Sequence, residues 1–189
     1  MAIVVLGWGS LCWDPGELRI RDGWHTDGPL LPIEFARISK HGRLTLVLHK
    51  RAKRVRVLWA DMNTVTISEA IGDLKKREET PNEKNIGWID LHKQKNNNCN
   101  TFRTALGIIK KWALTKHFDA VVWTDLPTNF RERTGKEFNK NNVITYLSNL
   151  DNGSRQKAEE YIRRAPREIR TRMRSTIEDQ LGWTHNSGL

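Results

Sequence analysis

The sequence predicts an α+β fold, in which a mixed β-sheet or a small β-barrel of about five to seven strands is flanked by helices. Three observations lead to this fold class. Apolar and β-branched runs recur along the chain, amphipathic helical patterns separate them, and the C-terminal part carries only helical patterns. With 189 residues and 38% hydrophobic content, the chain has the size of one ordinary domain, so we expect a single domain over residues 1–189.

The predicted strands begin with the run AIVVL at residues 2–6, which is continuous and apolar, as in a strand buried in the middle of a sheet. The runs GRLTLVLHK (42–50) and RVRVLWADM (54–62) alternate around β-branched residues and are joined by a basic link. This pattern predicts that the two runs form an antiparallel pair. Further buried strands are expected at IGWIDLH (86–92) and within FDAVVWTDLP (118–127).

The first predicted helix is TISEAIGDLKKREE, residues 66–79. Thr66 or Ser68 can cap its start, and basic residues gather at its electronegative end. The segment TFRTALGIIKKWALTKH (101–117) has the clearest amphipathic pattern. Between these two helices, the Asn-rich segment 93–100 is expected to be a polar, mobile loop without an active residue. The last predicted helices cover residues 141–150, 153–164 and 167–181.

The chain carries a large excess of basic residues: 32 Lys and Arg against 22 Asp and Glu, with a formal charge of +10. The excess is concentrated between Phe35 and Ala60, where there is no acidic residue. This segment is interpreted either as a solvated strand face with a basic hairpin turn or as a surface for nucleic acid or another anion. Its basic residues are Arg37, Lys40, Arg43, Lys50, Arg51, Lys53, Arg54 and Arg56.

Other chemistry-bearing residues give weaker signals. No stretch approaches the roughly 20 apolar residues of a membrane span, so we expect a soluble, cytoplasmic protein with no membrane contact. The spacing of the cysteines, Cys12 and Cys99, is not typical of a disulfide framework or of a metal site. Cys12 could act as a nucleophile, but a buried structural thiol is the more common outcome. The histidines also lack a metal-ligand spacing, so no zinc is expected: His25, His41, His49, His92, His117 and His185.

The first candidate site is the turn that ends the first strand, residues 7–11, GWGSL. Gly7 and Gly9 permit backbone geometries that a side chain would forbid. Successive backbone N–H groups in such a turn form a small concavity that binds a carboxylate or a phosphate. The segment lacks the third glycine of a dinucleotide fingerprint and the lysine of a P-loop. A purely structural turn is the alternative interpretation.

The second candidate site is the carboxylate pair Glu78 and Glu79 at the end of the helix 66–79. A helix C-terminus and a like-charged neighbour both disfavour ionisation, so one member of the pair is expected to have a raised pKa suited to a general base. Arg77 opposes that shift if its guanidinium points inward. The alternative is that both side chains are solvated at the helix end.

Together these segments resemble one family. The matching stretches are VVLGWGSLCWDPG (4–16), VLWADMNTVTISEAIGDLKKREE (57–79), DAVVWTDLPTNF (119–130) and AEEYIRRAP (158–166). In this order they are similar to the opening motif, the helix ending in Leu-x-x-Arg-Glu, the next interior strand and the Ala-x-x-Tyr-Ile stretch of the gamma-glutamylcyclotransferase-like superfamily, especially its ChaC-like branch. The family's motif tyrosine is Trp8 here, which replaces a hydroxyl by an indole N–H donor.

The resemblance implies a core over residues 1–165 of that family's fold and a C-terminal helical extension over 166–189. It also implies a γ-glutamyl cyclotransferase, in which the α-amine of a small γ-glutamyl substrate attacks its own γ-carbonyl and releases 5-oxoproline and an amine. No metal or cofactor takes part, and the protein is a monomer or a homodimer. Glu78 is the expected base by its position in the motif, with Glu79 as the nearest rival. The expected substrate-binding residues are Gly7, Trp8, Gly9, Ser10 and Leu11.

Two other functions remain open from the sequence. The first is a non-catalytic binding module on the same fold, in which the basic strands and the arginine-rich C-terminal helices engage nucleic acid. The second keeps the same site but uses it for another amide, such as a γ-glutamyl group on a larger molecule.

Overall fold

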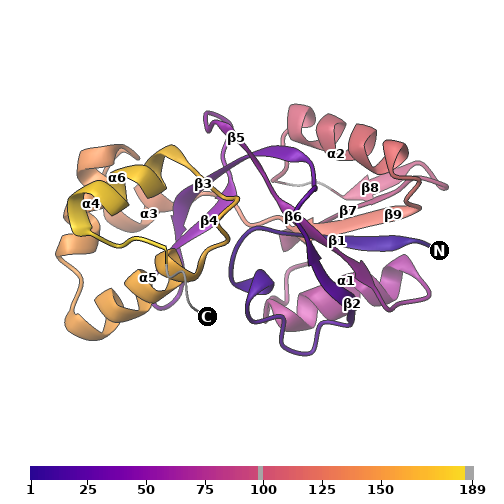
Figure 1. Ribbon diagram of the computed structural model, residues 1–189, viewed down its shortest axis with the longest axis horizontal. Helices are drawn as coiled ribbons and strands as arrows, with labels where there is room; N and C mark the ends of the chain where they lie inside the picture. Colours follow the sequence, from indigo (N-terminus) through magenta and orange to yellow (C-terminus); the bar gives the residue numbers. More distant parts are fainter. Residues whose placement is uncertain (98–99, 186–189) are drawn as a thin grey trace.

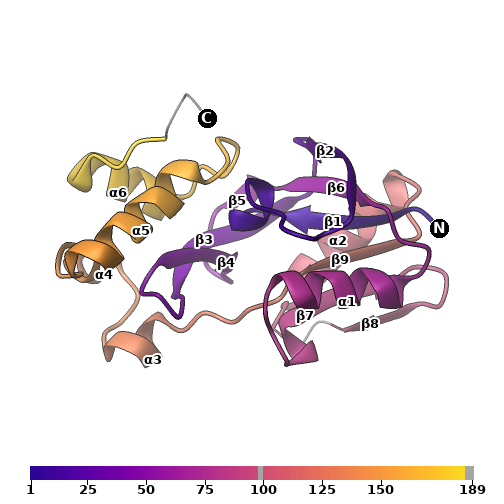
Figure 2. The ribbon, with the colours of Figure 1, turned by 90° about the horizontal axis from the view of Figure 1, so that it is seen from below.

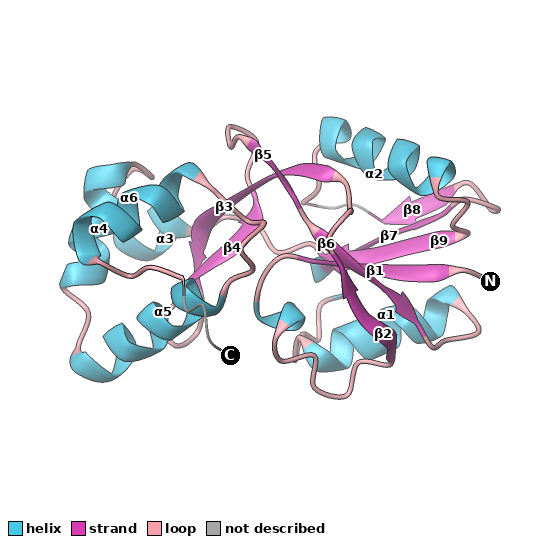
Figure 3. Cartoon of the chain, viewed as in Figure 1, coloured by secondary structure: helices cyan, strands magenta, loops and turns pink. Residues whose placement is uncertain are grey.

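Two β-sheets and the helices around them form the fold of the computed structural model, which describes residues 1–97 and 100–185 (Figure 1). One sheet is mixed and has six strands, and the other has three strands. The predicted α+β class with a mixed sheet flanked by helices is therefore confirmed (Figure 3). Of the two predicted forms, the barrel does not occur in the described ranges, because neither sheet closes on itself.

The six-stranded sheet has the order β2-β6-β1-β9-β7-β8. The central strand β1 runs parallel to β9 and antiparallel to β6, and all its residues are buried, as its apolar sequence predicts. The strands are β1 (Ile3–Gly7), β2 (Ile20–His25), β6 (Leu58–Met62), β7 (Ile86–Asp90), β8 (Lys95–Asn97) and β9 (Ala120–Thr124).

Helices cover both faces of this sheet, which explains the continuous apolar sequence of its central strands. Because successive strand residues point to opposite faces, Ile3 and Val5 join the hydrophobic cluster that contains Leu74 of α1 (Ile67–Arg77). Val4 and Leu6 join the cluster on the other face, with residues of α2 (Arg103–Thr115). Thr66 caps α1 by accepting a hydrogen bond from the backbone N–H of Glu69.

The second sheet has the order β4-β3-β5 and corrects one prediction. The runs 42–50 and 54–62 do not pair with each other, because β3 (Leu30–Ile38) lies between β4 (Leu44–Leu48) and β5 (Arg54–Arg56). The second run also divides, since β6 leaves this sheet and pairs with β1 and β2. The nine-residue strand β3 is long enough to pair with β4 at one end and with β5 at the other.

The remaining helices pack around the three-stranded sheet (Figure 2). They are α3 (Phe130–Thr134), α4 (Lys140–Ser148), α5 (Asn152–Arg164) and α6 (Arg172–Leu181). The segment predicted as a helix from residue 167 becomes helical only at Arg172. Residues of the expected C-terminal extension join the same hydrophobic cluster as β3 and β4: Ile169, Met173, Ile177 and Trp183.

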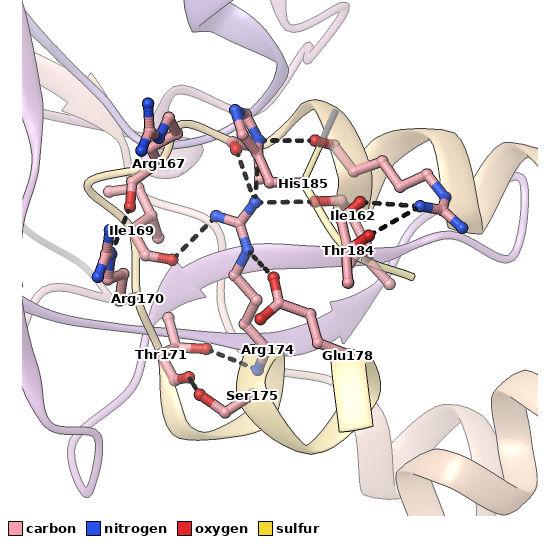
Figure 4. A network of polar contacts seen from close by, with 12 residues as sticks. Ile162, Arg167, Ile169, Arg170, Thr171, Arg174, Ser175, Glu178, Thr184 and His185 are labelled. Carbon is pink, nitrogen blue, oxygen red and sulfur yellow. Dashed lines mark hydrogen bonds and ion pairs between the residues drawn. The ribbon is translucent and has the colours of Figure 1, made fainter. Parts of the chain in front are cut away.

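A buried arginine holds the C-terminal segment in place (Figure 4). Arg174 is 3% exposed, and its guanidinium forms an ion pair with Glu178 at 3.1 Å. The same guanidinium donates to the backbone carbonyl oxygens of Ile162, Ala165, Pro166 and Ile169. These bonds join the end of α5 to the loop before α6, so that the last helix is fixed against the rest of the core.

The Asn-rich segment 93–100 differs from its prediction as a loop without strand structure. Its residues 95–97 form the edge strand β8, which pairs with β7 from Trp88 to Asp90. Cys99 lies outside the described residues.

Candidate active site

A cavity of about 980 Å³ lies between the two sheets and brings both predicted sites together. One wall comes from the turn after β1 and from the end of α1, and the other comes from the β3–β4 hairpin and from α5. All seven residues singled out from the sequence line this cavity: Gly7, Trp8, Gly9, Ser10, Leu11, Glu78 and Glu79.

The glycines of the turn are needed for close packing rather than for a left-handed backbone. Gly9 has φ −129°, so a positive φ is not the reason for glycine at this position. A Cβ atom at Gly9 would collide with the hydroxyl of Tyr161. At Gly7, a Cβ atom would lie 2.5 Å from the ring of Trp24. The two glycines thus let side chains from distant parts of the chain approach the backbone of the turn.

Arg77 links the turn to the end of α1. Its Nη2 donates to the carbonyl oxygen of Asp14 at 2.6 Å and to Oγ of Ser10 at 3.3 Å. Its Nη1 donates to Oε1 of Glu78 at 3.3 Å. One guanidinium therefore fixes the position of the Glu78 carboxyl relative to the turn, although these groups are far apart in the sequence.

The Glu78 carboxyl has the properties of a general base. Its side chain is 16% exposed, and burial raises its pKa above the ordinary value of 4.5. Arg77 and the Thr124 side chain oppose this shift, but burial has the larger effect. A carboxylate whose pKa is raised takes up a proton more readily than an ordinary carboxylate, which is the property that a general base needs.

Glu79 differs from its neighbour in burial and in backbone conformation. It is exposed and has φ +47°, in the left-handed region, directly after the C-cap residue Glu78. Its backbone N–H donates to the carbonyl oxygen of Lys76 at 3.1 Å. The geometry therefore favours Glu78 over Glu79 as the residue that acts on a ligand inside the cavity.

Tyr161 is a cavity residue that the sequence interpretation did not single out. It lies on α5 and is 6% exposed, and its hydroxyl accepts a hydrogen bond from the backbone N–H of Leu46 at 3.4 Å. Burial raises its pKa, and the nearby Glu78 adds to this effect. The tyrosine stands in the AEEYIRRAP segment, so its place in a matching motif was the available signal.

The structure divides the acid-free basic segment into two groups. Arg37, Lys40 and Arg43 line the cavity, on the wall opposite Glu78. The other members lie outside the cavity lining and are exposed: Lys50, Arg51, Lys53, Arg54 and Arg56. Sequence alone did not separate these groups, because the division depends on which end of the hairpin faces α5.

The remaining reactive residues contribute little to the cavity. Burial raises the pKa of the Cys12 thiol far above its ordinary value, and Glu168 adds to the shift, so the thiol is a weak nucleophile. Among the histidines, His41 lines the cavity. Within residues 1–97 and 100–185, no three His, Cys, Asp or Glu side chains gather closely enough to hold a metal ion.

Comparison of the chain with protein-family models, with curated proteins and with solved structures yields no match. None of the helices in the described ranges combines the length and the apolar character needed to cross a lipid bilayer.

Proposed function

We propose that the protein is a γ-glutamyl cyclotransferase-like enzyme that converts a γ-glutamyl amide into 5-oxoproline and a free amine. The observation that carries the proposal is the position of Glu78, whose carboxyl has a raised pKa and shares one cavity with the glycine-containing turn 7–11. The resemblance of residues 4–16 and 57–79 to the gamma-glutamylcyclotransferase-like motifs supports the same activity.

The reaction needs a folded substrate and one proton carrier. The substrate α-nitrogen forms a bond to the γ-carbonyl carbon, which closes a five-membered lactam, and the bond from that carbon to the leaving nitrogen breaks. Glu78 takes a proton from the attacking nitrogen and passes it to the leaving nitrogen. Both reacting groups belong to one molecule. Correct positioning therefore lowers the activation free energy by several kcal/mol, on the order of the proximity effects known for intramolecular reactions.

The turn supplies the anion-binding part of this site. Ser10 and Leu11 begin a short 3₁₀ turn (Ser10–Cys12), so their backbone N–H groups have no acceptor within that turn. We assign them to the substrate α-carboxylate or to the oxyanion that develops on the γ-carbonyl oxygen. The contacts from Arg77 to Ser10 and Glu78 hold these donors at a fixed distance from the base.

The decisive experiment incubates the full chain with a panel of γ-glutamyl amines and peptides and detects 5-oxoproline by mass spectrometry. The expected result is formation of 5-oxoproline by the wild type and a decrease of at least about 100-fold in Glu78→Gln, which keeps the shape of the side chain but cannot accept the proton. Glu79→Gln is the matched control. If Glu78→Gln is folded and fully active, Glu78 is not the base.

A second candidate function is nucleic-acid binding by the exposed basic residues outside the cavity. Lys50, Arg51, Lys53 and Arg54 are exposed and form no ion pair with a carboxylate in the described part of the chain. A gel shift with linear DNA or RNA at low and high salt tests this function. Charge reversal at these positions is expected to abolish a salt-sensitive shift, and absence of a shift in the wild type at low salt would exclude it.

A further inference from the structure

The two walls of the cavity carry opposite charges. The wall formed by the turn after β1 and the end of α1 has an excess of negative charge, with the carboxylates of Asp14, Glu17, Glu78 and Glu79 and the cations of Lys76 and Arg77. The opposite wall, formed by the β3–β4 hairpin and α5, has an excess of positive charge, with the cations of Arg37, Lys40, Arg43, Lys157 and Arg164 and the carboxylate of Glu160. A ligand that spans the cavity therefore meets carboxylates at one end and cations at the other.

The cations of the second wall are not neutralised by the protein. Ion pairs do neutralise the other basic side chains of the cavity, which pair as Lys76 with Glu17, Arg77 with Glu78 and Arg164 with Glu160. In residues 1–97 and 100–185, no carboxylate lies within ion-pair distance of Arg37, Lys40, Arg43 or Lys157. This wall thus has a net positive charge that the opposite wall does not share.

Two of these cations are held in position by neutral groups. Arg37 donates from Nη1 to the carbonyl oxygen of Pro127 at 2.8 Å, with the charges of Glu132 and Arg133 nearby. The guanidinium of Arg43 lies over the ring of Tyr161, 5.8 Å from its centroid. Both guanidinium groups are therefore held beside the cavity, and neither forms an ion pair with a carboxylate in the described part of the chain.

We propose that this wall binds a phosphate group on the leaving amine of the substrate, an inference that rests on the proposed cyclotransferase function. One carboxylate would need a single cation, whereas these four positive side chains match a group with two negative charges. Arginine forks also suit the oxygen geometry of phosphate. The cavity volume of about 980 Å³ leaves room for a leaving group beside the glutamyl group.

The first experiment measures anion binding without any turnover. The probe is inorganic phosphate, titrated into the full chain by calorimetry, with acetate as the singly charged comparison. Arg43→Gln and Lys157→Gln are each expected to weaken phosphate binding at least about fivefold, because each removes one charged donor. Lys157 is an exposed residue on α5, so its replacement preserves the fold. The matched control is Lys111→Gln, an exposed basic residue on α2 outside the cavity lining, which is expected to keep wild-type affinity.

The second experiment compares three substrates that differ only at the end of the leaving amine. They are γ-glutamylethanolamine, γ-glutamyl-β-alanine and γ-glutamyl-O-phosphoethanolamine, whose leaving groups end in a hydroxyl, a carboxylate and a phosphate. The expected order of kcat/KM places the phosphate first, at least about tenfold above the hydroxyl, and Lys157→Gln is expected to reduce this preference.

The results separate this inference from the proposed function. If phosphate binds with the expected loss in both cavity variants but no substrate yields 5-oxoproline, the anion site stands and the cyclotransferase fails. If 5-oxoproline forms equally well from all three substrates, or best from the carboxylate, the phosphate site is wrong and the cyclotransferase stands. Phosphate affinity that is equal in wild type, Arg43→Gln and Lys157→Gln also overturns the site.

Discussion

Arg77 donates a hydrogen bond from Nη2 to Oγ of Ser10 over 3.3 Å, which ties the last residue of α1 to the turn that follows β1. The same guanidinium contacts Glu78. One side chain therefore links the two predicted sites, and its charge also acts on the pKa of Glu78.

Replacing Arg77 is expected to change the titration of Glu78. In Arg77→Gln the positive charge that lowers the pKa of Glu78 is lost while burial still raises it, so the pKa of Glu78 rises further above 4.5. Carbon-13 NMR titration of the glutamate carboxyls measures this shift directly. The acid limb of the pH profile of kcat/KM is expected to move to higher pH with it.

Lys76→Gln is the control for Arg77→Gln, because Lys76 pairs with the exposed Glu17 and is not one of the groups that shift the pKa of Glu78. An equal shift in both variants would mean that Arg77 acts only through the general positive field of the protein.

Glu78→Gln is expected to change how stability depends on pH. Because the pKa of Glu78 is raised in the folded state, the folded protein binds more protons than the unfolded chain between the ordinary value of 4.5 and the raised value. The contribution of the Glu78 carboxyl to the free energy of unfolding is therefore fully present below about pH 4.5. It is lost as the pH rises through the pKa of Glu78 in the folded protein. Glu78→Gln has no carboxyl at this position, so its free energy of unfolding does not show this decrease.

Urea unfolding of wild type and Glu78→Gln across this pH range measures the difference. The free energy of unfolding of the variant should rise relative to wild type as the pH increases. Glu79→Gln, at the exposed neighbour, is measured in parallel as the control for loss of a carboxylate at the helix end. A constant difference between wild type and Glu78→Gln would contradict the raised pKa.

Local signals in the sequence predicted those parts of the fold that local physics determines. The helix α1 has its cap at Thr66 and its basic last turn within a few residues, and the predicted helix agrees with it. The strand β3 was missed because Pro32 and Glu34 interrupt its apolar pattern. The buried Glu34 carboxyl accepts hydrogen bonds from the backbone N–H groups of Phe35 and of Met173 on α6, and the contact with α6 is one that no local pattern reveals.

The candidate site shows the same division. The turn 7–11 and Glu78 follow from motifs. The places of Tyr161 and Arg37 in the cavity depend on contacts between segments 90 or more residues apart, as in the bonds from Leu46 to Tyr161 and from Arg37 to Pro127. The sequence also predicted that the runs 42–50 and 54–62 pair with each other. That prediction left out β3, the strand that places Arg37 at the cavity.

Arg174 is expected to be essential for the C-terminal helix. In Arg174→Gln, the carboxylate of Glu178 loses its partner, and the carbonyl oxygens of Ile162, Ala165, Pro166 and Ile169 lose charged donors. The expected cost is at least about 2 kcal/mol in the free energy of unfolding, measured with urea. Arg172→Gln, an exposed position on the same helix, is the control and should stay within about 0.5 kcal/mol of wild type. Similar losses in both variants would contradict a special contribution of the buried network.

Gly9→Ala is expected to lower stability because Tyr161 lies close to the turn. The new methyl group would overlap the Tyr161 hydroxyl, whereas φ of Gly9 is negative, −129°, so that no left-handed backbone adds to the cost. Overpacking of this kind costs about 1–3 kcal/mol, and urea unfolding measures the loss. In the double variant Gly9→Ala with Tyr161→Phe, the hydroxyl is absent and a large part of the loss should be recovered.

Gly72→Ala provides a control of opposite sign for this last prediction. Gly72 lies within α1, and a Cβ atom there meets no atom within 4 Å, so alanine should raise stability by up to about 1 kcal/mol through its higher helix propensity. If Gly9→Ala is as stable as wild type, Tyr161 does not press against the turn. If Gly9→Ala is destabilised and Tyr161→Phe recovers nothing, the cost arises in the turn itself. Recovery of stability in the double variant would show that the two residues are in contact at the candidate active site. If Tyr161→Phe acted independently of Gly9→Ala, it would lower the free energy of unfolding further.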